Sequence, residues 1–176
     1  MSSDFLSAYE ENVWSVYGYL AYRTATREEA EDLTQVTFER ALKAWSRFDP
    51  SRASPRTWLL VIARNALIDE RRRDRAAVPI DDDTSAVWAD PALSVPGPDE
   101  SRGGVGPELE AALGRLQPQE RDVLALRYGG DLTTGEISEL LDLTVANVQQ
   151  IASRGRRKLR REIEARADSG GVPSGP

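Results

Sequence analysis

The 176-residue sequence contains neither cysteine nor histidine. The absence of cysteine excludes disulfides and thiolate chemistry, and the absence of both residue types excludes the usual zinc sites and histidine acid–base catalysis. No apolar run approaches the roughly 18 residues of a membrane-spanning helix, and the N-terminus shows no basic start followed by an apolar stretch. Any catalysis would depend on carboxylates alone, and no acidic pair stands in an evidently apolar setting. We therefore expect a cytoplasmic protein that is not an enzyme, needs no metal or cofactor and does not engage a membrane.

The net charge of −6 is unevenly distributed along the chain. Residues 78–106 hold six acidic residues against one arginine, whereas the segments on either side are nearly neutral. Two basic clusters lie inside these neutral segments: Arg71, Arg72, Arg73 and Arg75, and then Arg154, Arg156, Arg157, Lys158, Arg160 and Arg161. Local basic clusters can bind nucleic acid even when the whole chain is acidic.

Apolar periodicity predicts a first helical block over residues 1–77. Apolar residues recur at three- and four-residue steps from Phe5 to Leu20. A second helix should begin at Thr26, because threonine caps helix N-termini, and a third after Ser54-Pro55, because proline suits the first helical turn. This third helix runs into the first basic cluster.

A second helical block is predicted over residues 107–168. Gly129-Gly130 should stop one helix. The residues from Thr133 to Glu136 have the spacing of a capping box for the next helix, and Thr144 can cap the last one after a tight turn at Asp142-Leu143. A short helix, a tight turn and a longer helix together indicate a helix-turn-helix.

The segment between the two blocks, residues 78–106, predicts a flexible acidic linker, because it holds four prolines, four glycines and the run Asp81-Asp82-Asp83. The glycine-, proline- and serine-rich residues 169–176 predict a disordered tail. The expected fold class is all-α, with two small helical domains joined by the linker. The two domains can sit well apart only if something holds them there.

The last predicted helix has the composition of a recognition helix for the major groove of DNA. Its start carries small or hydrogen-bonding side chains: Val145, Ala146, Asn147, Gln149 and Gln150. Asparagine and glutamine can pair with adenine, valine or alanine can contact a thymine methyl group, and later arginines can reach phosphates. The alternative is an ordinary helical hairpin with a solvated basic face.

Two further stretches in the first block suggest binding surfaces. Residues 58–73 combine Trp58, Asn65 and an arginine cluster, a mixture that suits single-stranded DNA; the alternative is a core helix with charges that favour its C-terminus. Residues 30–41 carry acidic and amide side chains around Phe38, which we expect to be partly exposed. This pattern indicates a docking surface for a basic partner helix, or else a solvated acidic face.

In order and spacing these stretches resemble the extracytoplasmic-function (ECF) branch of the sigma-70 family, from about Phe5 to Glu164 apart from the linker. AEDLTQVTFERALKAWSRF resembles region 2.2, whose helix binds the clamp coiled coil of RNA polymerase. SPRTWLLVIARNALIDERRR resembles regions 2.3 and 2.4, which capture the melted minus-ten element. LQPQERDVLALRYGGDLTTGEISELLDLTVANVQQIASRGRRKLR resembles region 4, which recognises the minus-thirty-five element.

The resemblance implies a sigma factor that binds core RNA polymerase, at the beta-prime clamp and the beta flap, and directs promoter recognition, DNA melting and transcription initiation. It implies polymerase contacts at Glu31, Asp32, Gln35, Phe38 and Glu39. Minus-ten contacts are implied at Trp58, Arg64, Asn65, Asp69, Arg72 and Arg73, with Asn65 at the pocket for a flipped base. Minus-thirty-five contacts are implied at Thr133, Thr144, Val145, Ala146, Asn147, Gln149, Gln150, Ser153, Arg154, Arg156 and Lys158. An anti-sigma factor is a further partner that members of the family often have.

The sequence departs from the family pattern at two places. Gln149-Gln150-Ile151 stands where the family usually has a basic residue and a serine before an arginine, and Asp142 replaces a common glycine. A regulator of the LuxR type has a similar C-terminal sequence, but it needs an upstream sensing domain, and no alternation of strands and helices is present here. A helical scaffold is a further alternative. We also hypothesise that Asp81, Asp82 and Asp83 hold the linker in a positively charged polymerase channel; alternatively they only keep a tether soluble.

Overall fold

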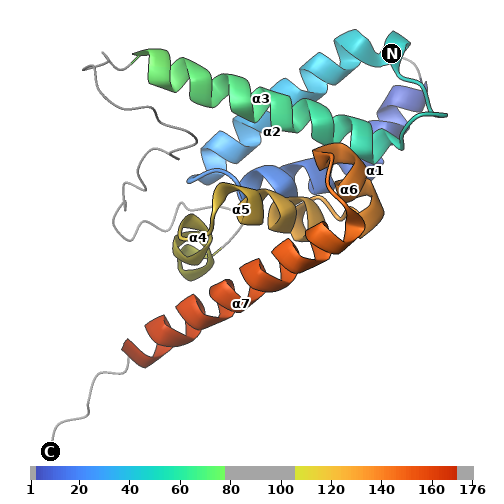
Figure 1. Ribbon diagram of the computed structural model, residues 1–176. Helices are drawn as coiled ribbons and strands as arrows, with labels where there is room; N and C mark the ends of the chain where they lie inside the picture. Colours follow the sequence, from blue (N-terminus) through green and yellow to red (C-terminus); the bar gives the residue numbers. More distant parts are fainter. Residues whose placement is uncertain (1–2, 78–105, 170–176) are drawn as a thin grey trace, which may run out of the picture.

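The computed structural model describes residues 3–77 and 106–169, and every regular element in these ranges is helical (Figure 1). The first block contains α1 (Ser3–Ala21), α2 (Arg27–Ala44), the 3-10 turn η1 (Trp45–Arg47) and α3 (Pro55–Ala77). The second contains α4 (Pro107–Gly114), α5 (Pro118–Leu124), the π-helical turn η2 (Ala125–Gly129), α6 (Thr134–Leu141) and α7 (Val145–Ser169). The predicted all-α class is confirmed for the described residues.

The predicted linker, including Asp81, Asp82 and Asp83, lies outside the described residues apart from Gly106, which is the N-cap of α4. The first residue of the predicted tail, Ser169, is instead the last residue of α7, and the rest of that tail also lies outside the described residues.

The helix caps expected from the sequence are confirmed. The Thr26 hydroxyl accepts a hydrogen bond from the Glu29 backbone N–H at 3.2 Å at the start of α2. Thr133 and Glu136 form a reciprocal capping box at the start of α6. Side-chain caps of this kind satisfy backbone donors that have no partner inside the helix.

The helix-turn-helix is formed by α6 and α7. The Thr144 hydroxyl accepts a hydrogen bond from the Asn147 backbone N–H at 3.2 Å, which caps the start of α7. Asp142 ends α6 in the left-handed region, at φ 53° and ψ 49°. Aspartate is tolerated in this conformation although glycine is favoured, so the substitution noted in the sequence costs some strain but keeps the tight turn.

The first block is a bundle in which α1, α2 and α3 pack against one another. An aromatic cluster closes one end of the bundle: the Trp45 ring stacks on Phe48 at 4.9 Å between centroids and meets the edges of Phe5 and Trp58 at 5.2 and 5.8 Å. Trp58 is therefore half-buried in this cluster. The cluster fixes the first turn of α3 relative to α2.

In the second block, α7 packs along α4, α5 and α6 (Figure 1). Gly155 of α7 lies directly against the Leu124 side chain, and a Cβ at position 155 would come within 2.9 Å of the Leu124 Cδ1 atom. The inner face of α7 carries Val148, Ile151 and Gly155, which are buried.

The two blocks share one hydrophobic core. Buried Val16, Tyr19 and Leu60 of the first block belong to the same cluster as Leu126 and Ile137 of the second. The turn η2 packs against α1 of the first block, and α5, which directly precedes η2, packs against α7. Sequence periodicity identified the apolar faces, but it gave no indication that the two blocks bury these faces against each other.

Two glycines, Gly18 of α1 and Gly129 of η2, bring the backbones of the two blocks close together. A Cβ on Gly18 would lie 2.5 Å from the Gly129 carbonyl oxygen, and a Cβ on Gly129 would lie 2.5 Å from the Gly18 carbonyl oxygen. Only residues without a side chain allow the two backbones to come this close.

Candidate nucleic-acid interface

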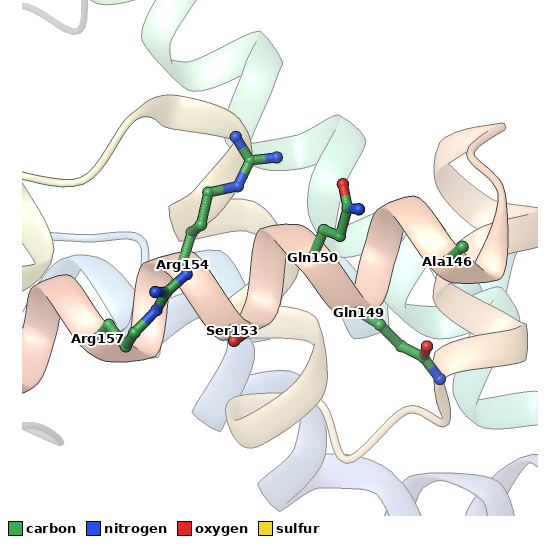
Figure 2. A pocket seen from close by; sticks show the side chains of 6 residues that line it. All are labelled: Ala146, Gln149, Gln150, Ser153, Arg154 and Arg157. Carbon is green, nitrogen blue, oxygen red and sulfur yellow. The ribbon is translucent and has the colours of Figure 1, made fainter.

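The start of α7 presents an open groove on the surface of the molecule. The groove has a volume of about 560 Å³ and is lined by Ala146, Gln149, Gln150, Ser153, Arg154 and Arg157. Figure 2 shows Gln150 and Arg154 extending to the same side of α7, as their four-residue spacing requires, while Gln149 points to the other side. The groove thus places amide groups near the start of the helix and guanidinium groups one to two turns later.

A second, smaller hollow lies between η2, α6 and α7. It measures about 190 Å³ and is lined by Arg127, Tyr128, Thr134, Ile137, Val148, Gln149, Ala152 and Arg156. Gln149 contributes to both hollows, whereas Arg156 lines only the second. Arg127 and Tyr128 are absent from the site residues chosen from the sequence. Tyr128 is 52% exposed, and the only signal for it in the sequence was an aromatic residue directly before Gly129-Gly130.

Other residues predicted at this surface have different surroundings. Val145 and Asn147 are exposed beside the groove, while the hydroxyls of Thr133 and Thr144 cap α6 and α7. Lys158 faces α5, where its Nζ atom lies 2.8 Å from both carboxylate oxygens of the buried Glu120. The structure therefore brings Arg154 and Arg157 to the groove but directs the charge of Lys158 elsewhere.

The α3 helix carries the residues predicted to contact the minus-ten element. Asn65, Arg72 and Arg73 are exposed, and Arg73 also forms an ion pair with Glu70 at 3.1 Å. Asp69 is bound by the Arg40 Nη1 group at 2.8 Å, and this hydrogen bond lowers the pKa of the Asp69 carboxyl group. Asp69 thus holds α3 to α2, and Arg72 and Arg73 beyond it remain exposed, whereas Arg71 donates to the Arg23 carbonyl oxygen at 2.7 Å.

Arg64, another of the six predicted minus-ten residues, is engaged by the second block. Its Nε group donates to the Asp122 Oδ2 atom at 3.0 Å. The Tyr19 hydroxyl donates to the Asp122 Oδ1 atom at 3.0 Å, and the Arg23 Nε atom lies 3.8 Å from the same oxygen. Burial, and secondarily the Asp122 charge, raises the pKa of Tyr19, so the phenol stays protonated and donates.

More polar contacts join the start of α3 to the second block. Arg56 donates to the Asp131 carboxylate at 2.9 Å, and the Thr57 hydroxyl donates to the Glu136 carboxylate at 3.2 Å. Burial alone would raise the pKa of Glu136, but hydrogen bonds from Thr133 and Thr57 outweigh it and lower the value. None of these contacts between the blocks was predicted from the sequence.

The α2 helix presents the predicted docking surface. Glu31, Asp32, Gln35 and Glu39 are exposed, and Gln35 donates to Glu39 at 3.0 Å along the helix. The expectation of a partly exposed Phe38 is wrong. Its side chain is only 7% exposed, because the ring packs edge-to-face on Tyr9 of α1 with a centroid distance of 4.7 Å.

Comparison with known proteins gives two matches to family models. "Sigma-70 region 2" matches residues 8–77 and "Sigma-70, region 4" matches residues 112–161. The ECF RNA polymerase sigma factor SigM of Bacillus subtilis is 30% identical over 152 residues, which cover 86% of this chain and 90% of the relative. The chain belongs to the ECF branch of the sigma-70 family.

Other comparisons agree with this assignment. The ECF sigma factor SigX of Bacillus subtilis is 30% identical over 172 residues, with 93% of this chain and 86% of the relative covered. The fold matches that of the sigma factor RpoE from Bartonella quintana, solved in complex with the anti-sigma factor NepR, with a TM-score of 0.67, 19% identity, and coverage of 93% and 98% of the two chains. This sigma factor therefore acts in promoter-directed transcription initiation.

The family assignment decides among the alternatives left open by the sequence. A match of region 2 across residues 8–77 is incompatible with the sensing domain that a LuxR-type regulator needs, and with an unrelated helical scaffold. In residues 3–77 and 106–169, no group of acidic side chains is arranged to hold a metal ion. Within the same ranges no helix is both long and apolar enough to span a membrane.

Proposed function

We propose that this sigma factor binds the minus-thirty-five element with the start of α7, the minus-ten strand with the outer face of α3, and core polymerase with the exposed face of α2. In this proposal residues 1–77 act as region 2, residues 78–106 as a linker and residues 107–168 as region 4. The observation that carries the proposal most directly is the open groove of α7, lined by Gln149, Gln150, Arg154 and Arg157.

The groove of α7 suits the edge of duplex DNA. Glutamine amides can form two hydrogen bonds with adenine in the major groove, and arginines can bind guanine or the flanking phosphates. Gln150 and Arg154 lie on one side of the helix and Gln149 on the other (Figure 2), so the two glutamines should contact different base pairs. Arg156, in the second hollow with Tyr128, is placed to contact a phosphate beside the groove.

The outer face of α3 suits an opened strand. Asn65 offers an exposed amide that can bind the edge of an unstacked base, and the exposed Arg72 and Arg73 follow two turns later for the backbone. Trp58 contributes through the aromatic cluster that positions α3 more than as an open stacking platform, because its ring is packed on Trp45 and Phe48.

The partners follow from the same surfaces. An acidic and amide-rich face of α2 suits a basic helix of the polymerase clamp, with a second polymerase contact, to the beta flap, made by region 4. The solved relative bound to NepR supports an anti-sigma factor as a further partner. Since these partners and the promoter are cytoplasmic, we place this protein in the cytoplasm.

Run-off transcription with core polymerase and a randomised promoter library tests the proposal. The wild-type chain should select a minus-thirty-five and a minus-ten sequence. Asn65→Ala should lose selection only at the minus-ten element and Gln150→Ala only at the minus-thirty-five element. A chain that gives no promoter-dependent transcript, or variants that lose both selections together, would refute the assignment of these surfaces.

A further inference from the structure

The packing of regions 2 and 4 against each other conflicts with simultaneous binding of both promoter elements, if the proposed function holds. The two elements are named for positions about 25 base pairs apart, or roughly 85 Å of straight duplex at ~3.4 Å per base pair. The longest helix, α7, has 25 residues and spans only ~37 Å. Residues 78–105 can bridge at most ~95 Å when fully extended, which is enough for the regions to separate.

Separation of the regions must break a polar contact in which three side chains of region 2 surround one carboxylate of region 4. A single carboxylate, that of Asp122 in region 4, accepts hydrogen bonds from Tyr19 and Arg64 at 3.0 Å each and has Arg23 at 3.8 Å. Within the described part of the chain, the Arg23 Nε group is buried and donates no hydrogen bond. Two guanidinium groups and a phenol therefore surround one negative charge without using all of their donors.

These three donors belong to region 2, whereas the acceptor belongs to region 4. When the regions separate, Asp122 leaves, and Tyr19 of α1, Arg23 of the turn after α1 and Arg64 of α3 remain together in region 2. Separation opens this site to water, so the two guanidinium groups and the phenol become available to another anion. Asn65, the proposed base contact, follows Arg64 directly in the sequence.

We propose that Tyr19, Arg23 and Arg64 form a phosphate-binding site of region 2, which Asp122 occupies in the closed chain and a phosphate of the minus-ten strand occupies in the open one. A phosphodiester carries one negative charge and two free oxygens, so it matches the donors as well as a carboxylate does. Closure of the chain and binding of the strand therefore compete for the same donors. This coupling keeps the free sigma factor from binding the minus-ten strand until polymerase separates its regions.

The two glycines at the interface allow the chain to be opened without altering the proposed site. Gly129→Ala places a Cβ 2.5 Å from the Gly18 carbonyl oxygen, so the regions must move apart, yet all three donors stay intact. Gly135→Ala is the matched control, because a Cβ at position 135 has room: the Thr133 hydroxyl oxygen, in ordinary van der Waals contact at 3.9 Å, is its nearest neighbour outside the adjoining helix backbone. Asp122→Asn opens the site by removing only the charge.

The opening is measured by energy transfer in the full chain. The sequence has no cysteine, so cysteines introduced at the exposed Ser51 and Glu164 are the only labelling sites. Gly129→Ala and Asp122→Asn should lower the transfer efficiency and strengthen binding of a single strand that spans the minus-ten element of a library-selected promoter. Gly135→Ala should change neither. Unchanged transfer and affinity in both opening variants would overturn the competition.

The phosphate contact is measured in the open Gly129→Ala background and in the holoenzyme. Arg23→Gln should weaken strand binding roughly tenfold there, and Tyr19→Phe less, while Arg23→Lys should recover part of the loss. Strand phosphates are then replaced one at a time by neutral methylphosphonates. Replacement at one position should weaken strand binding by the Gly129→Ala variant, whereas the Gly129→Ala/Arg23→Gln double variant should be insensitive to replacement at that position. Equal sensitivity of the two chains would overturn the phosphate site.

The outcomes separate this inference from the proposed function. If Arg23→Gln has no effect but Asn65→Ala still weakens strand binding, the minus-ten surface stands and the phosphate site is refuted. If neither substitution matters, the minus-ten surface itself is refuted. Circular dichroism of each variant shows that its helices are retained, so a loss of binding is not a loss of fold.

Discussion

The two surfaces that we propose for DNA binding differ in how much of each is accessible. In region 4, the groove at the start of α7 is open, and Gln149, Gln150 and Arg154 are exposed along it (Figure 2). In region 2, Asn65 is exposed, but Arg64 is bound to Asp122 of region 4.

The two surfaces therefore differ in whether the chain must rearrange before DNA can bind. The region 4 surface is complete in the closed chain, so it requires no rearrangement before it meets duplex DNA. Under the competition proposed above, the region 2 surface is completed only when region 4 leaves. This order suits the two targets, because the minus-thirty-five element is recognised as duplex, whereas the minus-ten strand becomes available only after melting.

The strongest test of this comparison is a truncation in the shared core. Leu126 is fully buried in the cluster that joins the two regions, so Leu126→Ala should lower the free energy of unfolding by ~2–5 kcal/mol and also increase the distance between the regions. Leu113 is equally buried but belongs to a separate cluster whose buried members all lie in region 4, with the partly buried Tyr22 of region 2 packed against it. Leu113→Ala should therefore lower stability by a similar amount but increase the distance between the regions less than Leu126→Ala does. Urea denaturation and energy transfer measure the two effects, and parallel changes in both variants would argue against an interface held by the shared core.

The open groove of α7 gives the next largest effect. Gln150→Ala should change the preference at a base pair of the minus-thirty-five element by ~1–3 kcal/mol. Arg156→Ala should weaken all sequences alike and reduce the salt dependence, because it lines the neighbouring hollow and is placed for a phosphate. Holoenzyme binding to a panel of minus-thirty-five variants at two salt concentrations distinguishes these outcomes. A uniform loss for Gln150→Ala would remove its role in base recognition.

The proposed polymerase surface of α2 is exposed in the closed chain and should respond independently of the contact between the regions. Replacing the exposed Asp32 and Gln35 by alanine should weaken binding to core polymerase by more than ~1 kcal/mol, with no change in the circular dichroism spectrum. Lys43→Ala, at an exposed position near the end of the same helix, should have little effect on affinity. A titration in which both variants bind like the wild type would exclude α2 as the docking helix.

The smallest expected effect is on the pH dependence of stability. In the folded chain the pKa of Glu136 is lowered from its usual 4.5. Its contribution to stability is therefore complete above pH 4.5 and is lost as the pH falls through the folded-state pKa. The contribution should be under about 1 kcal/mol, because the group is partly exposed and screened. Glu136→Gln should reduce the loss of stability at acid pH, as measured by thermal unfolding at a series of pH values. An unchanged slope would show that its bonds to Thr133 and Thr57 add nothing.

Local features of this fold were predictable because their causes are local. Thr26, Thr133 and Thr144 lie within three residues of the backbone groups that they cap, so spacing alone revealed them. Gln149 and Gln150 could be placed at the start of an exposed helix because the apolar residues of α7 repeat with helical period. The family resemblance rested on the same stretches and is confirmed by the comparisons.

The parts that could not be predicted depend on residues far apart in the chain. Tyr19 and Asp122 are separated by 103 positions, and nothing near either residue indicates the other. Phe38 was expected to be partly exposed because carboxylates surround it in sequence, but Tyr9 of another helix covers its ring. Lys158 was assigned to DNA from its basic neighbours, whereas Glu120 of α5 determines where its charge points.

The π-helical turn Ala125–Gly129 sets the rotational register of the contact between the two regions. An α-helix turns by about 100° per residue, so one extra residue in a wider turn offsets everything after it by about that angle. Deleting a single residue from this turn should rotate Gly129 away from Gly18 and bring a side chain toward α1 instead. The length of this one turn therefore determines which face of region 4 can meet region 2.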